Sequence, residues 1–165
     1  MNSSEIRKIL TRAKTIAVVG LSKDPEKESY GVATYMKKHG YCIIPVNPTI
    51  DEVLGEKSYP SLLDIPLTIQ KESDIVDIFR RPEDVFPIVE QAVKLREKNG
   101  KPGVVWMQLG IVNKEAAAIA EKAGLTVVMN KCMMKEHKSL VKVKKTQITR
   151  IVKPAGRAAT KRESR

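Results

Sequence analysis

Five short runs of apolar residues, rich in valine and isoleucine, recur along the chain. They occupy residues 16–19, 42–46, 75–79, 104–107 and 125–129. Both faces of each run are apolar, which is typical of strands that are covered by helices on both sides of a sheet. The pattern therefore predicts five buried strands.

Segments with helical period separate these runs. In the first segment, apolar side chains recur at the spacing that places them on one face of a helix, at Ile6, Ile9, Leu10 and Ala13. Further helices are predicted over about residues 30–39, 83–99 and 114–123. Each of these three has a lysine in its last turn and a glycine just after it, which favours helix termination there. Their starts are marked by Ser29, Pro82 and Asn113.

Strand and helix thus alternate, and this order requires parallel pairing through right-handed crossovers. The chain is predicted to be an α/β protein with a doubly wound, parallel, five-stranded sheet in a single domain. The stretch from 47 to 73 has a weaker pattern. It is predicted to be mostly loop, with one helical turn at residues 61–64, where Ser61 and Asp64 have capping-box spacing.

Composition agrees with one soluble domain, since 42% of the 165 residues are apolar and 30% are charged. The formal net charge is +11, and nearly all of it comes from residues 138–165. We therefore divide the chain into a globular domain, residues 1–137, and a basic C-terminal tail, residues 138–165. Within the tail, residues 141–144 alternate as an edge strand does, and the part beyond Pro154 is predicted to be disordered.

The basic tail has two interpretations. A run of like charges is usually a solvated extension, but it can also contact nucleic acid or another anionic surface by neutralising phosphates. No aromatic residues lie among the cations. Binding of nucleic acid through the tail would therefore be independent of sequence and sensitive to salt.

Two cysteines, Cys42 and Cys132, are too few for a disulfide framework, and each lies in or beside an apolar run that is predicted to be core. A reducing, cytoplasmic location is expected. We find no export signal and no stretch long and apolar enough to span a membrane. Oligomeric state is not indicated by the sequence.

Ligands of open parallel sheets bind beyond the carboxyl ends of the strands, so the loops that follow the strands are the candidate site. A dinucleotide fingerprint is not met, because Ser22 replaces its second glycine and the second strand ends in Asn47 instead of an acidic residue. Cations occur in three of the loops: Lys23 or Lys27, Arg80 or Arg81, and Lys131. Such a site, with a helix N-terminus beside it, suits a nucleotide with several phosphates and a long uncharged arm.

Six blocks of the chain carry a resemblance to a known family: residues 16–22, 29–33, 44–48, 74–82, 105–111 and Cys132. In this order they resemble the small stand-alone CoA-binding proteins, which are similar to the N-terminal CoA-binding domain of the succinyl-CoA synthetase α subunit. The resemblance covers about residues 14–137 and implies a Rossmann-like fold and a coenzyme A ligand. The basic tail lies outside it.

The resemblance also implies which residues bind the nucleotide. The pyrophosphate is expected near the first loop and the following helix, at Gly20, Leu21, Ser22, Lys23, Lys27, Ser29 and Tyr30. The adenosine end is expected near Asn47 and Pro48, and the pantetheine arm near Phe79, Arg80, Gln108 and Leu109. Lys27 and Lys131 replace expected arginines, and Asn130 replaces an expected aspartate. Lysine cannot form a bidentate pair with a phosphate, which predicts weaker binding.

Other chemistry is weakly indicated. Cys132 and His137 lack further ligands for a metal site; Cys132 could instead lie near the free end of CoA, where thiol–disulfide exchange becomes possible. Asp77 is interpreted as structural, and Trp106 and Met107 as core. No set of nucleophile, base and orienting group is visible. We therefore expect binding of CoA or acyl-CoA without catalytic residues; an acyl-transfer enzyme and an NAD-binding or other nucleotide-binding protein are the alternatives.

Overall fold

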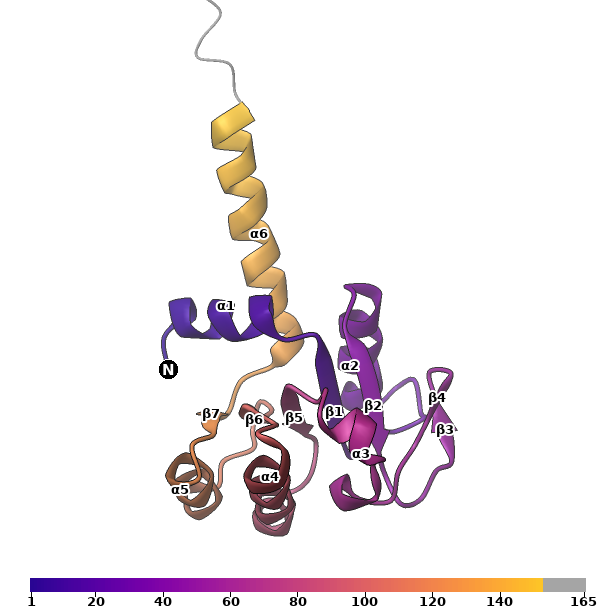
Figure 1. The fold of residues 1–165 in the computed structure, drawn as a ribbon. Helices are drawn as coiled ribbons and strands as arrows, with labels where there is room; N and C mark the ends of the chain where they lie inside the picture. Colours follow the sequence, from indigo (N-terminus) through magenta and orange to yellow (C-terminus); the bar gives the residue numbers. More distant parts are fainter. Residues whose placement is uncertain (153–165) are drawn as a thin grey trace, which may run out of the picture.

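A five-stranded parallel sheet forms the centre of the protein in the computed structural model, which describes residues 1–152 (Figure 1). Its strand order is β2-β1-β5-β6-β7, and all neighbours are parallel. The predicted doubly wound, Rossmann-like α/β fold is confirmed. The strands are β1 (Thr15–Val19), β2 (Cys42–Val46), β5 (Ile75–Ile78), β6 (Val104–Met107) and β7 (Thr126–Val128).

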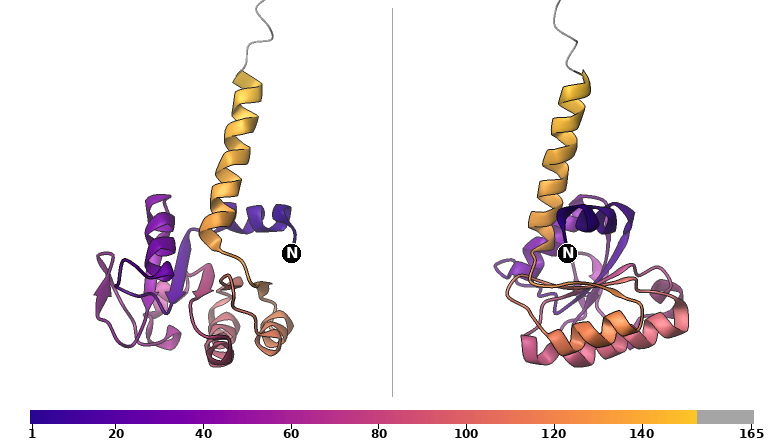
Figure 2. Two further views of the ribbon diagram at one scale, coloured as in Figure 1. Left: turned by 180° about the vertical axis from the view of Figure 1, so that it is seen from behind. Right: turned by 90° about the vertical axis from the view of Figure 1, so that its left-hand side faces the viewer.

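Helices cover both faces of the sheet (Figures 1 and 2). On one face lie α1 (Ser3–Arg12), α2 (Glu28–Lys38) and the first turns of α6 (Met133–Val152). On the other lie α4 (Val85–Asn99) and α5 (Lys114–Lys122). Because both faces are covered, most residues of the inner strands are buried, as their apolar runs predict.

Local capping fixes where several helices begin and end. The Asn2 side chain accepts a hydrogen bond from the Glu5 N–H, and the Glu5 carboxylate accepts one from the Asn2 N–H, so α1 begins with a capping box. Asn113 caps α5 by accepting from the Ala116 N–H at 2.9 Å. The predicted glycine stops are also confirmed: α2, α4 and α5 end just before a glycine with positive φ, namely Gly40, Gly100 and Gly124.

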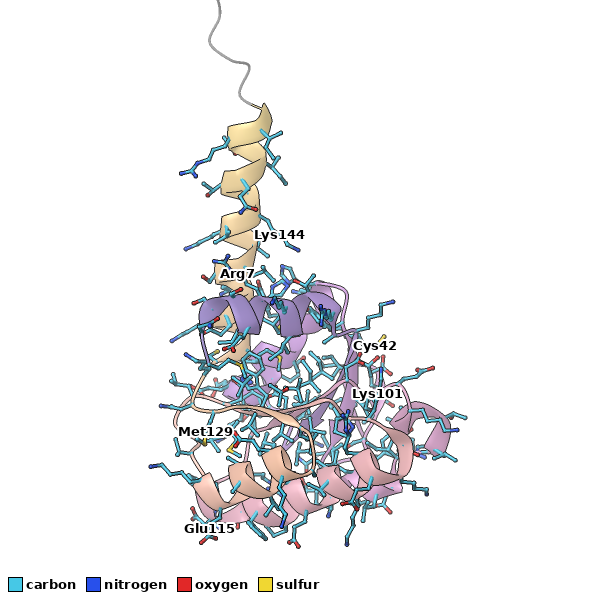
Figure 3. All side chains as sticks on the ribbon, turned by 60° about the vertical axis from the view of Figure 1, so that its left-hand side comes forward. Arg7, Cys42, Lys101, Glu115, Met129 and Lys144 are labelled. Carbon is cyan, nitrogen blue, oxygen red and sulfur yellow. The ribbon has the colours of Figure 1, made fainter. Side chains whose placement is uncertain are left out.

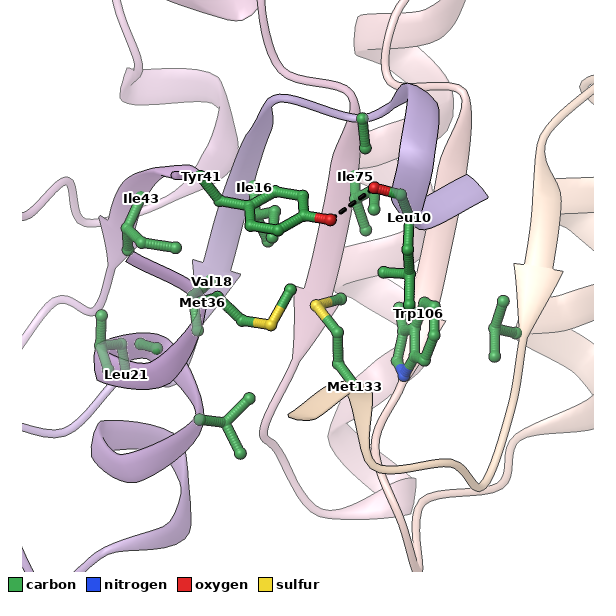
Figure 4. Packing of buried hydrophobic residues seen from close by; sticks show 14 of the residues in the cluster. Leu10, Ile16, Val18, Leu21, Met36, Tyr41, Ile43, Ile75, Trp106 and Met133 are labelled. Carbon is green, nitrogen blue, oxygen red and sulfur yellow. Dashed lines mark hydrogen bonds between the residues drawn. The ribbon is translucent and has the colours of Figure 1, made fainter. Parts of the chain in front are cut away.

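Trp106 lies in the core on the α1, α2 and α6 side of the sheet (Figure 4). It is fully buried, and its indole N–H donates to the Lys131 carbonyl at 2.8 Å. Met107, on the opposite face, is also fully buried. Both residues are therefore core, as predicted. The buried Tyr41 hydroxyl donates to the Leu10 carbonyl and so ties the start of β2 to α1.

The segment from 47 to 73 contains more regular structure than the sequence predicts. It forms a short hairpin of β3 (Glu52–Val53) and β4 (Glu56–Lys57), then η1 (Leu62–Asp64) and α3 (Leu67–Gln70). The predicted turn at 61–64 is confirmed, and its Ser61 hydroxyl donates to the Asp64 carboxylate at 2.8 Å.

The predicted edge strand at 141–144 is wrong, because this segment lies inside α6. Buried side chains of α6 come from its first turns, at Met133, His137 and Leu140. The rest of the helix projects away from the body (Figure 1). The disorder predicted beyond Pro154 lies outside the described residues.

His137 anchors the first turns of α6 to α2. Its Nδ1 and the Tyr35 hydroxyl are 2.9 Å apart, and the imidazole is buried among aromatic rings of Tyr35, His39 and Tyr41. The Lys138 ammonium lies 5.3 Å from the centre of the Tyr35 ring. His137 is therefore part of the folded body.

Cys42 lies beside core, as predicted, because the other four residues of β2 are buried, but its own side chain is exposed. It is the first residue of β2, and β2 is an edge strand of the sheet. Its side chain therefore lacks a strand neighbour on one side. Figure 3 shows its sulfur at the surface of the body.

Candidate functional site

The strand order places the candidate site between β1 and β5. The chain passes from β1 to β2 on one side of β1, and then returns to β5 on its other side. The loops that follow β1 and β5 therefore diverge at the carboxyl ends of two neighbouring strands. Such a switch point leaves room for a ligand in an open parallel sheet.

Gly20 brings the two loops into backbone contact. It has a φ of +84°, and a Cβ placed on it would lie 2.2 Å from the Phe79 carbonyl oxygen. Its N–H also donates to the Val46 carbonyl at 2.8 Å. Only glycine satisfies both the backbone conformation and the close approach at this position.

The loop that follows Gly20 is held by its own hydroxyl groups. The Ser29 hydroxyl accepts from the Ser22 N–H at 3.0 Å, and the Ser22 hydroxyl accepts from the Asp24 N–H at 3.0 Å. The loop leads into α2, whose N-cap residue, Lys27, makes no side-chain capping hydrogen bond. First-turn N–H groups of a helix have no partner within the helix, so this end can accept an anion.

The two neighbouring arginines after β5 differ in their partners. Arg81 pairs with Asp84 at 2.9 Å and with Glu83 at 3.5 Å. Arg80 takes part in no salt bridge among residues 1–152, and its Cδ would lie 3.3 Å from a Cβ at Gly20. Arg80 is therefore the arginine whose charge is available beside the first loop.

A buried network of hydrogen bonds lies beneath the loops of the candidate site. The Met133 N–H donates to the Gln108 side-chain oxygen at 3.2 Å, and the Gln108 amide nitrogen donates to the Asp77 carboxylate at 2.6 Å. All three residues are buried. Burial raises the pKa of Asp77 to about 7, although hydrogen bonds from Gln108 and the Ile78 backbone oppose this shift. Asp77 is structural, and it fixes how Gln108 faces the site.

An open groove runs along these loops in two adjoining parts of about 630 and 310 Å³. Lys27, Glu28, Phe79 and Leu109 line both parts, which joins them into one surface. The structure brings together nine of the fourteen predicted site residues along it: Gly20, Ser22, Lys27, Ser29, Phe79, Arg80, Gln108, Leu109 and Cys132.

Five predicted residues do not line this groove. Leu21 is fully buried in the core, Tyr30 packs against that core, and Lys23 and Pro48 are exposed. The Asn47 amide donates to the Leu21 carbonyl at 3.0 Å, and its side-chain oxygen accepts from the Thr49 N–H at 2.9 Å. Asn47 therefore connects the loops that follow β1 and β2.

Several lining residues escaped the sequence interpretation. The carboxylates of Glu28 and Asp84 lie beside the cations, so the groove is not uniformly positive. Met134 and Lys135 line the end near Cys132. Recognising these two required knowing that α6 starts at Met133, directly after the last loop.

A family model described as "CoA binding domain" matches residues 14–138. The chain belongs to this CoA-binding domain family. Membership supports a role in binding CoA, and the match includes the loops and strands that form the groove. The predicted family is thus confirmed.

Relatives of similar length share most of the chain. The uncharacterized protein YneT of Bacillus subtilis is 43% identical over 136 residues, which are 82% of this chain and 94% of YneT. A solved structure of a hypothetical protein from Pyrococcus horikoshii is 45% identical, with a TM-score of 0.78 over 86% of this chain and 93% of that one. Both likenesses end short of the full chain.

Larger enzymes contain a related segment. Acetate–CoA ligase (ADP-forming) II of Archaeoglobus fulgidus is 42% identical over 83 residues, which are 49% of this chain but 12% of the ligase. The matched segment is therefore a small part of the ligase.

Two further classes of feature are not found in the described part of the chain. No helix among residues 1–152 has the length and apolar character needed to cross a membrane. Within the same residues, no group of three or more His, Cys, Asp or Glu side chains is arranged to hold a metal ion.

Proposed function

We propose that this protein binds coenzyme A, or an acyl-CoA, in the groove at the carboxyl ends of the strands without catalysing a reaction. The observation that carries the proposal is that nine predicted residues from five separate loops and helices line one groove in a chain of the CoA-binding domain family. The name of the related ligases, which includes CoA as a substrate, adds support.

The proposed ligand lies along the groove with its pyrophosphate at α2 and its thiol end near Cys132. The pyrophosphate lies at the N-terminus of α2, near Arg80 and Lys27, where main-chain N–H groups and cations favour an anion. The adenosine end extends toward Asn47 and Pro48. The pantetheine arm follows Phe79 and Leu109, whose apolar surface suits its uncharged chain, and its thiol end reaches Cys132.

A binding role fits the residue types that line the groove. Its lining among the described residues includes no histidine; His137 is buried against Tyr35 on the face of the sheet that α2 covers. An acyl-transfer enzyme would instead release or transfer the acyl group of acyl-CoA, and incubation of the purified protein with acetyl-CoA distinguishes the two functions.

The proposal is tested by thermal unfolding with CoA, dephospho-CoA, NAD and ATP. A ligand that binds the native state raises its stability by RT ln(1 + [L]/Kd). At a concentration of about 100 Kd, CoA is expected to raise Tm by roughly 5–10 °C. Dephospho-CoA should raise it less, and NAD and ATP less still. A larger shift with NAD would refute the proposal.

Replacement of Arg80 by glutamine is expected to weaken CoA binding by roughly ten- to hundredfold, because a hydrogen bond to a charged group contributes about 1.5–3 kcal/mol. The matched control is Arg81→Gln, which removes the same charge from a side chain that already pairs with Asp84. Isothermal titration calorimetry measures both. Equal losses in the two variants would show that Arg80 has no special role.

Cys132 is expected to react with CoA disulfide faster than Cys42 does, although Cys42 is the more exposed. In this exchange the Cys132 thiolate attacks one sulfur, a protein–CoA disulfide forms, and the other CoA leaves as a thiolate. Binding in the groove would hold the disulfide beside Cys132.

Intact-mass spectrometry over time on Cys42→Ser and Cys132→Ser variants separates the two sites. The Cys42→Ser variant should gain one CoA, and Cys132→Ser should react slowly. A small neutral disulfide should show the reverse order, since exposure then decides the rate. Faster reaction of CoA disulfide at Cys42 would contradict the proposed direction of the ligand.

A further inference from the structure

A concentrated positive surface lies on the side of the molecule away from α4 and α5. It consists of the exposed part of α6 and the neighbouring face of α1, and we call it the α1/α6 surface. Its cations are Arg7, Lys8 and Arg12 of α1 and Lys138, Lys142, Lys144, Lys145 and Arg150 of α6. None of these cations takes part in a salt bridge among residues 1–152.

The two helices enclose a corner at the base of the projecting part of α6. A cavity of about 320 Å³ fills this corner, and Arg7, Lys8, Arg12 and Lys144 line it together with polar and apolar side chains but no carboxylate. Figure 3 shows Arg7 and Lys144 close to one another, at the opposite end of the body from Glu115. Cations from two helices therefore face a common space.

Cations also surround the projecting part of α6. Lys138, Lys142 and Lys145 follow at i, i+4 and i+7, which places them on one side of the helix. Lys144 lies on a different side of the helix, toward α1. A helix with cations on two sides can contact a polyanion whose phosphates lie on both sides of it.

Positive charge alone is compatible with several kinds of partner, and the side chains argue against three of them. A second copy of the chain would place these cations against one another, which is repulsive. A lipid surface requires a broad apolar face, usually with aromatic or leucine side chains, whereas the large exposed apolar residues on the described part of α6 are Ile148 and Ile151. Single-stranded nucleic acid is bound through stacking on aromatic rings, and α6 has none.

We propose that the α1/α6 surface binds double-stranded DNA through its phosphates, with little sequence preference. The major groove admits an α-helix. With the projecting part of α6 in the groove, its cations contact the phosphates on both sides, and the α1 cations reach the backbone near the base of the helix. Ile148 and Ile151, which are 59% and 82% exposed, would then lie against the groove.

The proposal is tested with the full chain and a fluorescein-labelled duplex of mixed sequence, by fluorescence anisotropy between about 50 and 200 mM salt. The variants are Lys142→Gln with Lys145→Gln, and Arg7→Gln with Lys144→Gln. The matched control is Lys94→Gln with Lys122→Gln, which removes two exposed charges from α4 and α5 on the other face. An unchanged thermal midpoint shows that each variant is folded.

Each α1/α6 pair is expected to weaken DNA binding by roughly tenfold or more, and to lower the slope of log K against log salt by about two. The control pair should match the wild type. Equal behaviour of all three pairs would overturn the proposal. It would also be overturned by tighter binding to single-stranded DNA of the same length, or to phosphatidylserine vesicles at the same salt concentration.

Discussion

Replacement of Gly20 by alanine is expected to destabilise the protein by about 2–5 kcal/mol and to weaken CoA binding by roughly tenfold or more. Two effects combine at this residue. The left-handed φ of +84° is unfavourable for any side chain, and the new Cβ would lie 2.2 Å from the Phe79 carbonyl oxygen. Relief of this overlap requires the loops that follow β1 and β5 to separate, and these loops form the proposed phosphate site.

The two effects on stability can be separated with Gly40→Ala. Gly40 has a φ of +93°, but a Cβ there would meet no atom within 4 Å. This variant should lose about 1–2 kcal/mol from backbone strain alone, and its CoA affinity should not change. Chemical denaturation measures both variants. Similar losses of stability for Gly20→Ala and Gly40→Ala would show that the contact between the two loops is not rigid.

Replacement of Asp77 by asparagine is expected to change how stability depends on pH. Burial raises the pKa of the Asp77 carboxyl from its ordinary value of 3.8 to about 7. The folded state therefore retains a proton that the unfolded chain has released. The stabilisation by this group is complete below pH 4 and is lost as the pH rises to about 7. The asparagine variant has no such proton to lose.

The expected size of this effect is roughly 3 kcal/mol between pH 5 and pH 8, since one pKa unit corresponds to about 1.4 kcal/mol. Urea denaturation at several pH values should show the wild type losing that much stability relative to Asp77→Asn. His137, whose pKa burial lowers, is present in both proteins, so its contribution cancels in the difference. Replacement of the exposed Asp51 by asparagine controls for the loss of a surface carboxylate. Parallel curves for wild type and Asp77→Asn would contradict the account.

The central sheet was predictable because its strands are buried on both faces. A run of Val and Ile residues indicates a buried strand by itself, without knowledge of which strands lie next to it in the sheet. The ends of α2, α4 and α5 were predictable because the signal is local: a glycine follows each helix, and Gly40, Gly100 and Gly124 adopt positive φ there. The parallel pairing of the strands followed from the alternation of strand and helix, whereas their order in the sheet did not.

Features that depend on contacts distant in sequence were not predictable. Val141 and Val143 alternate with lysines, which is typical of a strand, and the buried face of α6 is too short to show a helical period. The position of β2 at the sheet edge was not predictable either, because it is decided by where β5 pairs.

The loops that form the candidate site were predictable, but the roles of several individual side chains were not. Parallel strands place their carboxyl ends together, so residues as distant as Ser22, Arg80 and Cys132 could be assigned to one edge. The Leu21 side chain is buried in the core, and the Asn47 side chain connects two loops. The pairing of Arg81 with Asp84 could be seen only in three dimensions.

The most direct test of the central claim is a crystal structure of the protein with CoA. We expect electron density along the groove, with the pyrophosphate at the N-terminus of α2 beside Arg80 and the thiol end within reach of Cys132. An empty groove at a CoA concentration well above Kd would contradict the proposal. So would CoA bound with its phosphates in the cationic corner between α1 and α6.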